Sequence, residues 1–138
     1  MIADDLEAMF ARDVEIDIDG VLAAFERLKE KATSDSVPQL VSAMHSPRSN
    51  FWIRELLSEP ICELGGSDYL DVLLDAAQLG LDEGYDNDGF HFHLTELAIS
   101  DPVLCRAKLE QLLEREDFRH REAAHWLLDF CVLGESEP

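Results

Sequence analysis

Two pairs of side chains in this sequence have residue types that bind metal ions or move protons. Glu122 and His125 are three residues apart, so on a helix they share a face, as the ligands of helical carboxylate and histidine metal sites do. Such two-metal sites need a second copy of the pair and further glutamates from facing helices, and the sequence has no second copy. His91 and His93 are two residues apart, which directs them to different sides of a helix. The spacing therefore argues against a metal centre at either pair.

The aspartate-rich segment 82–89 resembles a calcium-binding loop in part of its pattern. Asp86 and Asp88 fit the third and fifth positions of the EF-hand loop, but Gly84 and Thr95 fall at its first and twelfth positions, where carboxylates are required. No calcium site is therefore expected. The segment is either a turn with an aspartate cap or an acidic contact loop with an aromatic edge. That edge consists of Tyr85, Phe90 and Phe92.

Other catalytic motifs are missing from the sequence. It has no glycine-rich phosphate loop and no nucleophile elbow, so we expect no enzymatic activity and no cofactor. The cysteines are odd in number and widely spaced among apolar neighbours, which favours reduced, buried thiols over disulfides or a zinc site. They are Cys62, Cys105 and Cys131.

The strongest chemical signal is a long segment without any cation. Between Glu55 and Cys105 there is no lysine or arginine, yet twelve of the chain's 30 acidic residues lie there. Ordinary protein surfaces intersperse both signs, whereas an uncompensated block attracts and orients positively charged partners. The twelve are Glu55, Glu59, Glu63, Asp68, Asp71, Asp75, Asp82, Glu83, Asp86, Asp88, Glu96 and Asp101.

Length and composition restrict the class of protein. With 138 residues, 46% of them hydrophobic, the chain is long enough for a single domain, 1–138, with a real core. The net charge of −19 disfavours direct contact with nucleic acid or with anionic lipid. No stretch has the roughly 20 apolar residues of a membrane span, and the acidic start does not resemble a signal peptide, so a cytoplasmic protein is expected.

Apolar residues recur at helical spacing in every segment and predict an all-α fold of about eight helices. Asp101 followed by Pro102 is a typical helix start, and Gly65 with Gly66 is a typical helix end. The chain is expected to end in a tail, 134–138. The predicted helices are 4–12, 18–32, 36–45, 50–64, 68–83, 88–100, 102–115 and 119–133.

These helices fall into successive pairs. Leu40, Leu73 and Leu109 occupy similar places in the first helix of three pairs, about 33 to 36 residues apart. A period of this length is typical of helical-hairpin repeats, in which each unit buries its apolar face on its neighbours.

From Val37 to Leu133 the chain resembles the HEAT-like repeat family. Pro38 and Pro102 lie near the starts of first helices, and Asp117 with Arg121 matches the aspartate of the turn and the cation of the second helix. The turns 46–48 and 116–119 are also of the expected type. The first pair offers only Arg48 or Arg54 for that cation, and the middle pair offers none. The resemblance implies an α-solenoid scaffold that binds proteins, with rare lyase relatives that act together with partners.

The carboxylates of the cation-free segment form two stripes on consecutive predicted helices. Residues four apart share a helix face, which aligns Glu55, Glu59 and Glu63 on one helix and Asp71, Asp75 and Asp82 on the next. Like charges at this spacing cost an isolated helix about 0.2–0.5 kcal/mol per pair. The stripes are either a merely solvated face or an acidic docking surface. Basic residues gather in the last pair, at Arg106, Lys108, Arg115, Arg119 and Arg121.

Three hypotheses of function follow. The first is a non-catalytic repeat module whose acidic surface docks a basic protein, in its most concrete form an immunity-type inhibitor of a bacterial toxin such as a nuclease. The second is a HEAT-like adaptor that binds through its concave surface, and the third is a lyase-type accessory protein that uses His125. The first hypothesis predicts these partner-binding residues: Glu55, Glu59, Glu63, Asp71, Asp75, Asp82, Asp86 and Asp88 for charge, with Trp52, Tyr85 and Phe90 as aromatic anchors if their side chains are exposed.

Overall fold

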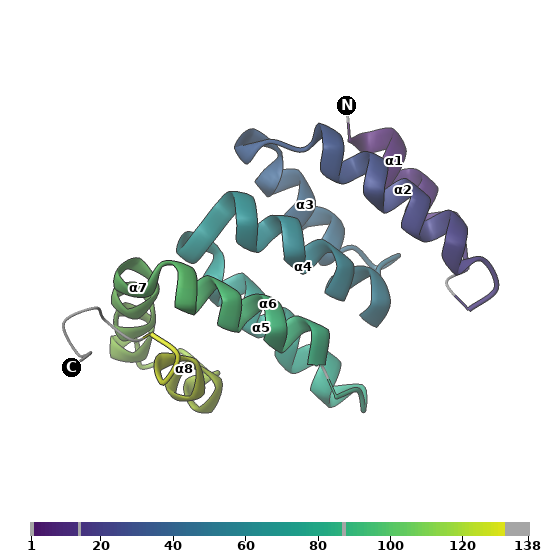
Figure 1. Ribbon diagram of the computed structural model, residues 1–138. Helices are drawn as coiled ribbons and strands as arrows, with labels where there is room; N and C mark the ends of the chain where they lie inside the picture. Colours follow the sequence, from purple (N-terminus) through teal and green to yellow (C-terminus); the bar gives the residue numbers. More distant parts are fainter. Residues whose placement is uncertain (1, 14, 87, 132–138) are drawn as a thin grey trace. The chain divides into compact units, whose positions relative to one another are not determined.

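The computed structural model describes residues 2–13, 15–86 and 88–131, and these form helices and turns without a β-strand (Figure 1). The all-α class predicted from the sequence is confirmed for this part of the chain. Short 3-10 helices, Ser34–Ser36 and Gly66–Tyr69, precede the third and fifth α-helices. The α-helices are α1 (Ala3–Phe10), α2 (Ile18–Lys31), α3 (Val37–Met44), α4 (Phe51–Gly65), α5 (Leu70–Asp82), α6 (Asp88–Ser100), α7 (Pro102–Glu114) and α8 (Arg121–Leu128).

The helix bounds agree with the sequence predictions to within two residues, except at the last helix. The predicted helix 119–133 is wrong at its end, because α8 stops at Leu128. The amides of Asp129, Phe130 and Cys131 each donate to the carbonyl three residues earlier, at 3.3, 2.9 and 3.0 Å. Such bonds belong to tight turns and not to an α-helix. The predicted residues 132–133 and the tail 134–138 lie outside the described residues.

The contacts divide the chain into two compact units, Met1–Leu64 and Gly65–Pro138. In the first unit α1 packs against α2 (Figure 1). Asp5 of α1 is buried at this contact, where its carboxylate accepts hydrogen bonds from Lys31 at 3.0 Å and Arg27 at 3.3 Å. The hydrogen bond from Lys31 is the main cause that holds the pKa of Asp5 below its usual value, against the opposing effect of burial.

The second unit contains α5 to α8. The chain reverses between α5 and α6 at Gly84, whose φ of +95° is a conformation that glycine adopts without strain. The amide of Gly84 donates to the carbonyl of Leu81, and that of Tyr85 donates to Gly80, both at 3.0 Å. These bonds satisfy carbonyls at the end of α5 and turn the chain into α6. The turn therefore sets the position of the aspartates that follow it.

The leucines that suggested a repeat, Leu40, Leu73 and Leu109, are all fully buried. Among the described residues, none of the helices has both the length and the hydropathy that a membrane span requires.

Candidate functional site

The predicted stripe on α4 is partly balanced by a cation from another helix. Glu55 and Glu59 are half-buried and Glu63 is exposed. The ammonium of Lys29, on α2, lies 3.2 Å from the carboxylate of Glu59 and 3.2 Å from that of Glu26. Burial acts to lower the pKa of Lys29, but the hydrogen bonds to the two glutamates outweigh it and the pKa is raised. The expectation that no cation balances this stripe is therefore wrong at Glu59.

The stripe on α5 is balanced in the same way at Asp75. The Oδ1 atom of Asp75 lies 3.0 Å from Nε2 of His120 and 3.3 Å from a guanidinium nitrogen of Arg119. Asp71, one turn earlier, is half-buried, and its side chain accepts from the backbone of Val72. Both side chains reach Asp75 from the connection between α7 and α8, and Arg119 supplies the positive charge. Here too the cation-free segment is compensated by residues distant in the sequence.

The end of the α5–α6 hairpin has no such compensation. Asp82, Asp86 and Asp88 are exposed, and within the described part of the chain none of them forms an ion pair with a lysine, arginine or histidine. Asp82 and Asp86 have uncharged hydrogen-bond donors: Gln78 donates to Asp82 at 3.0 Å, and the amide of Asp88 donates to Asp86 at 3.3 Å. We call these three aspartates the acidic hairpin end. Among the predicted carboxylates, these three lie at one end of the α5–α6 hairpin and are exposed without an ion pair to any described residue.

The dipole of α5 makes the position of Asp82 unfavourable. Asp82 is the last residue of α5, and the last turn of that helix contains no basic residue. The C-terminus of a helix carries a partial negative charge and is stabilised by cations, whereas a carboxylate there is repelled. A cation bound beside Asp82 would relieve this repulsion, whereas Asp88, in the first turn of α6, is already stabilised by its own helix.

The aromatic predictions have mixed outcomes. Phe90 is 1% exposed and packs in the core of the second unit, so its predicted role as a contact anchor is wrong. Phe92, two residues further along α6, is 59% exposed, because a shift of two positions moves a side chain to the far side of a helix. Tyr85 is half-buried beside the acidic hairpin end. Trp52 is half-buried in the first unit, with its ring edge-on to Phe51 at 5.7 Å.

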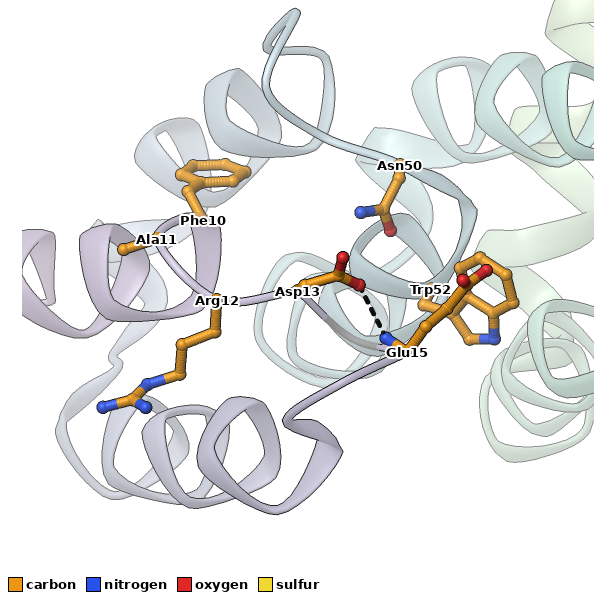
Figure 2. A pocket seen from close by; sticks show the side chains of 7 residues that line it. All are labelled: Phe10, Ala11, Arg12, Asp13, Glu15, Asn50 and Trp52. Carbon is orange, nitrogen blue, oxygen red and sulfur yellow. Dashed lines mark hydrogen bonds between the residues drawn. The ribbon is translucent and has the colours of Figure 1, made fainter.

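Trp52 lines an open hollow of about 530 Å³ in the first unit (Figure 2). Figure 2 shows Phe10 and Trp52 at opposite sides of this hollow. Its polar groups serve local structure: Asp13 accepts from the amide of Glu15 at 2.9 Å, and Asn50 accepts from the amide of Ile53 at 3.0 Å near the start of α4. Asp13 and Asn50 thus cap and brace the local chain at this hollow.

A second hollow, of about 360 Å³, lies beside the acidic hairpin end. It is lined by two predicted carboxylates, Asp75 and Asp82, and by Arg119 and His120, which were not predicted as site residues. The only sequence signal for them was the gathering of basic residues in the last helix pair. The side chain of His120 is 11% exposed, and it contacts Asp75 from the residue directly before α8.

The histidines and the glutamate considered for metal binding are not part of a larger cluster of ligands in the described residues. Within residues 2–13, 15–86 and 88–131, no group of three or more His, Cys, Asp or Glu side chains has the arrangement of a metal site. Glu122 and His125 are exposed, and His91 lies against the ring of Trp126 at 4.8 Å.

The cysteines are free and buried, as the sequence predicts. Burial, with a smaller contribution from Glu63, raises the pKa of Cys62 to about 12. The side chains of Cys105 and Cys131 lie close enough to share a hydrogen bond, and burial raises the pKa of both thiols. Protonated thiols of this kind are poor nucleophiles.

No protein-family model, curated protein or solved structure matches this chain.

Proposed function

We propose that this chain is a non-catalytic protein-binding module whose acidic surface docks a basic protein. The observation that carries the proposal is the acidic hairpin end, where Asp82, Asp86 and Asp88 are exposed and unbalanced while Glu59 and Asp75 have cationic neighbours. A partner that brings lysine or arginine to this end gains attraction from three carboxylates. One partner of this chemistry is the cationic groove of a bacterial toxin such as a nuclease, for which the chain would act as an immunity-type inhibitor in the cytoplasm.

Charge of this kind acts mainly on the rate of association. Opposite potentials steer two proteins into encounter, and salt screens the attraction over about 8–10 Å. We expect association to slow by at least tenfold, roughly, between low and high salt, while dissociation changes less.

The experiment compares two variants with the same change in net charge. Proteins retained by the immobilised chain at low salt and released at high salt are identified by mass spectrometry, and the purified partner is then used for kinetic measurements. In the test variant Asp82, Asp86 and Asp88 are replaced by lysine. The control variant carries Asp4→Lys, Glu30→Lys and Asp35→Lys, at exposed positions of the first unit.

We expect the test variant to associate at least about tenfold more slowly at low salt and the control variant to resemble the wild type. An acidic partner, a complex insensitive to salt, or equal association rates of the two variants would refute the proposal.

A HEAT-like adaptor is the second candidate function. It is supported by the succession of helix pairs and by the burial of Leu40, Leu73 and Leu109. An adaptor that binds through the concave surface of a repeat stack does not depend on the acidic hairpin end. Unchanged affinity of the test variant for a salt-insensitive partner would favour it.

A further inference from the structure

The helix α6 has a second face, opposite to the one that packs in the core. Its buried residues are Phe90, Leu94, Leu97 and Ala98. With 100° between successive residues of a helix, Asp88, Phe92, Glu96 and Ile99 fall together on the other side. All four are exposed. We call these four residues the outer face of α6.

The outer face alternates between acidic and apolar side chains. Phe92 and Ile99 are each 59% exposed, which is far more than such side chains show when a neighbouring element covers them. Asp88 and Glu96 form no ion pair within the described residues. An apolar face flanked by unbalanced carboxylates fits a partner that is apolar along one line and basic beside it.

The spacing of the apolar residues indicates the shape of that partner. Phe92 and Ile99 are seven residues apart, so about 10 Å separates them along the helix axis. A second helix with apolar residues at every third or fourth position places its own side chains at this interval and packs alongside. An extended segment alternates its side chains every two residues and does not match two widely spaced contacts on a convex helix.

We infer that the outer face of α6 binds a basic amphipathic helix of the partner, with lysine and arginine directed to Asp88, Glu96 and the acidic hairpin end. This inference rests on the proposed function and gives the partner a structural class. A second copy of this chain is a poor occupant, because each copy carries a net charge of −19 and would bring carboxylates against carboxylates.

The test uses two synthetic peptides of identical composition, each of about 15 lysine and leucine residues, long enough to span the outer face. In the first, leucines recur at i, i+3, i+4 and i+7, so that a helix has one apolar face. In the second, the same residues are shuffled so that no helix face is apolar. Affinity for the full chain is measured by fluorescence anisotropy at low salt.

Three variants separate the contributions of charge and apolar contact. Phe92→Ser with Ile99→Ser removes the apolar contacts of the outer face. Ile16→Ser with Leu22→Ser is the matched control, because these two apolar residues are exposed in the first unit. The third variant is the lysine replacement of the acidic hairpin end. Thermal unfolding checks that each variant is folded.

We expect the amphipathic peptide to bind at least about tenfold more tightly than the shuffled one. The variant of Phe92 and Ile99 should abolish this difference without changing the affinity for the shuffled peptide, whereas the matched control should preserve it. Equal binding of the two peptides, or an unaffected preference in the Phe92 and Ile99 variant, would overturn the amphipathic helix but leave the basic partner intact. If the lysine replacement of the acidic hairpin end does not weaken the binding of either peptide, this would instead count against the proposed function itself. Self-association of the wild-type chain through Phe92 would replace the inferred partner with a second copy.

Discussion

Phe90 and Phe92 form a matched pair that tests the assignment of the two faces of α6. Phe90 is 1% exposed and Phe92 is 59% exposed, so the same substitution to alanine should have very different effects. A phenylalanine that is almost wholly buried removes on the order of 150–250 Å² from water, and its truncation to alanine in a core costs about 3–5 kcal/mol. The equivalent change at an exposed position stays within about 0.5 kcal/mol.

The effect on thermal unfolding follows from the size of the chain. Unfolding entropy is about 2.1 cal/mol/K per residue, so over 138 residues a loss of about 3 kcal/mol lowers Tm by about 10 °C. We expect Phe90→Ala to show at least this decrease and Phe92→Ala to melt within about 2 °C of the wild type. Far-ultraviolet circular dichroism, which follows the loss of helix on heating, and urea titration provide the measurements.

Two results would contradict this reasoning. If Phe90→Ala costs less than about 1 kcal/mol, its side chain is not part of a packed core. If Phe92→Ala costs as much as Phe90→Ala, then Phe92 is covered in solution and cannot be a docking residue. A partner-binding measurement completes the pair, since only Phe92→Ala should weaken binding in a protein of unchanged stability.

Three further predictions concern the turn, the ion pairs and the thiols. Gly84→Ala should cost about 1 kcal/mol in urea unfolding, because φ is positive there, while Gly84→Asn should cost less; equal costs would contradict the role of the turn. A double-mutant cycle of Lys29→Met and Glu59→Gln should give a coupling energy of about 0.5–1 kcal/mol, and zero coupling would show that Lys29 does not balance α4. The thiol of Cys62, with its pKa raised to about 12, should resist iodoacetamide in the folded chain at about pH 9 and react after denaturation. Because the folded pKa is raised, the contribution of this thiol to stability should be complete below the unfolded pKa and decline between about pH 9 and pH 12; labelling at the same rate in both states would contradict its burial.

The sequence predicts the helices well because burial on one face imposes a period that is visible in the residue types. The bounds of α6, Asp88 and Ser100, illustrate this, since they agree with the prediction. The end of α8 was missed because a tight turn and a helix place Phe130 and Cys131 at similar spacing, and hydrogen bonds decide between them.

The candidate site was predicted less completely, for a reason of distance along the chain. Lys29 is 30 residues from Glu59, and Arg119 is 44 residues from Asp75, so a segment that lacks cations in sequence acquires them in space. Asp82, Asp86 and Asp88, in and beside the α5–α6 turn, form no ion pair within the described residues, although Asp82 lines the same hollow as Arg119. The prediction for Phe90 was wrong for another reason. Phe90 and Phe92 are equally hydrophobic, and only their positions around α6 decide which ring is buried and which is exposed.

The distribution of cations over the chain supports a functional role for the acidic hairpin end. The chain has 11 basic residues against 30 acidic ones, so a surplus of negative charge is unavoidable and only its location is free. Several of the cations are held in internal contacts, as Arg27 with Asp5 and Arg119 with Asp75 illustrate. A surplus that served solubility alone would be equally effective when spread over the surface. Asp82, at the C-terminal end of α5, instead opposes the helix dipole, whereas Asp88, at the start of α6, is favoured by it. Binding of a cationic partner beside Asp82 should therefore raise the stability of the second unit.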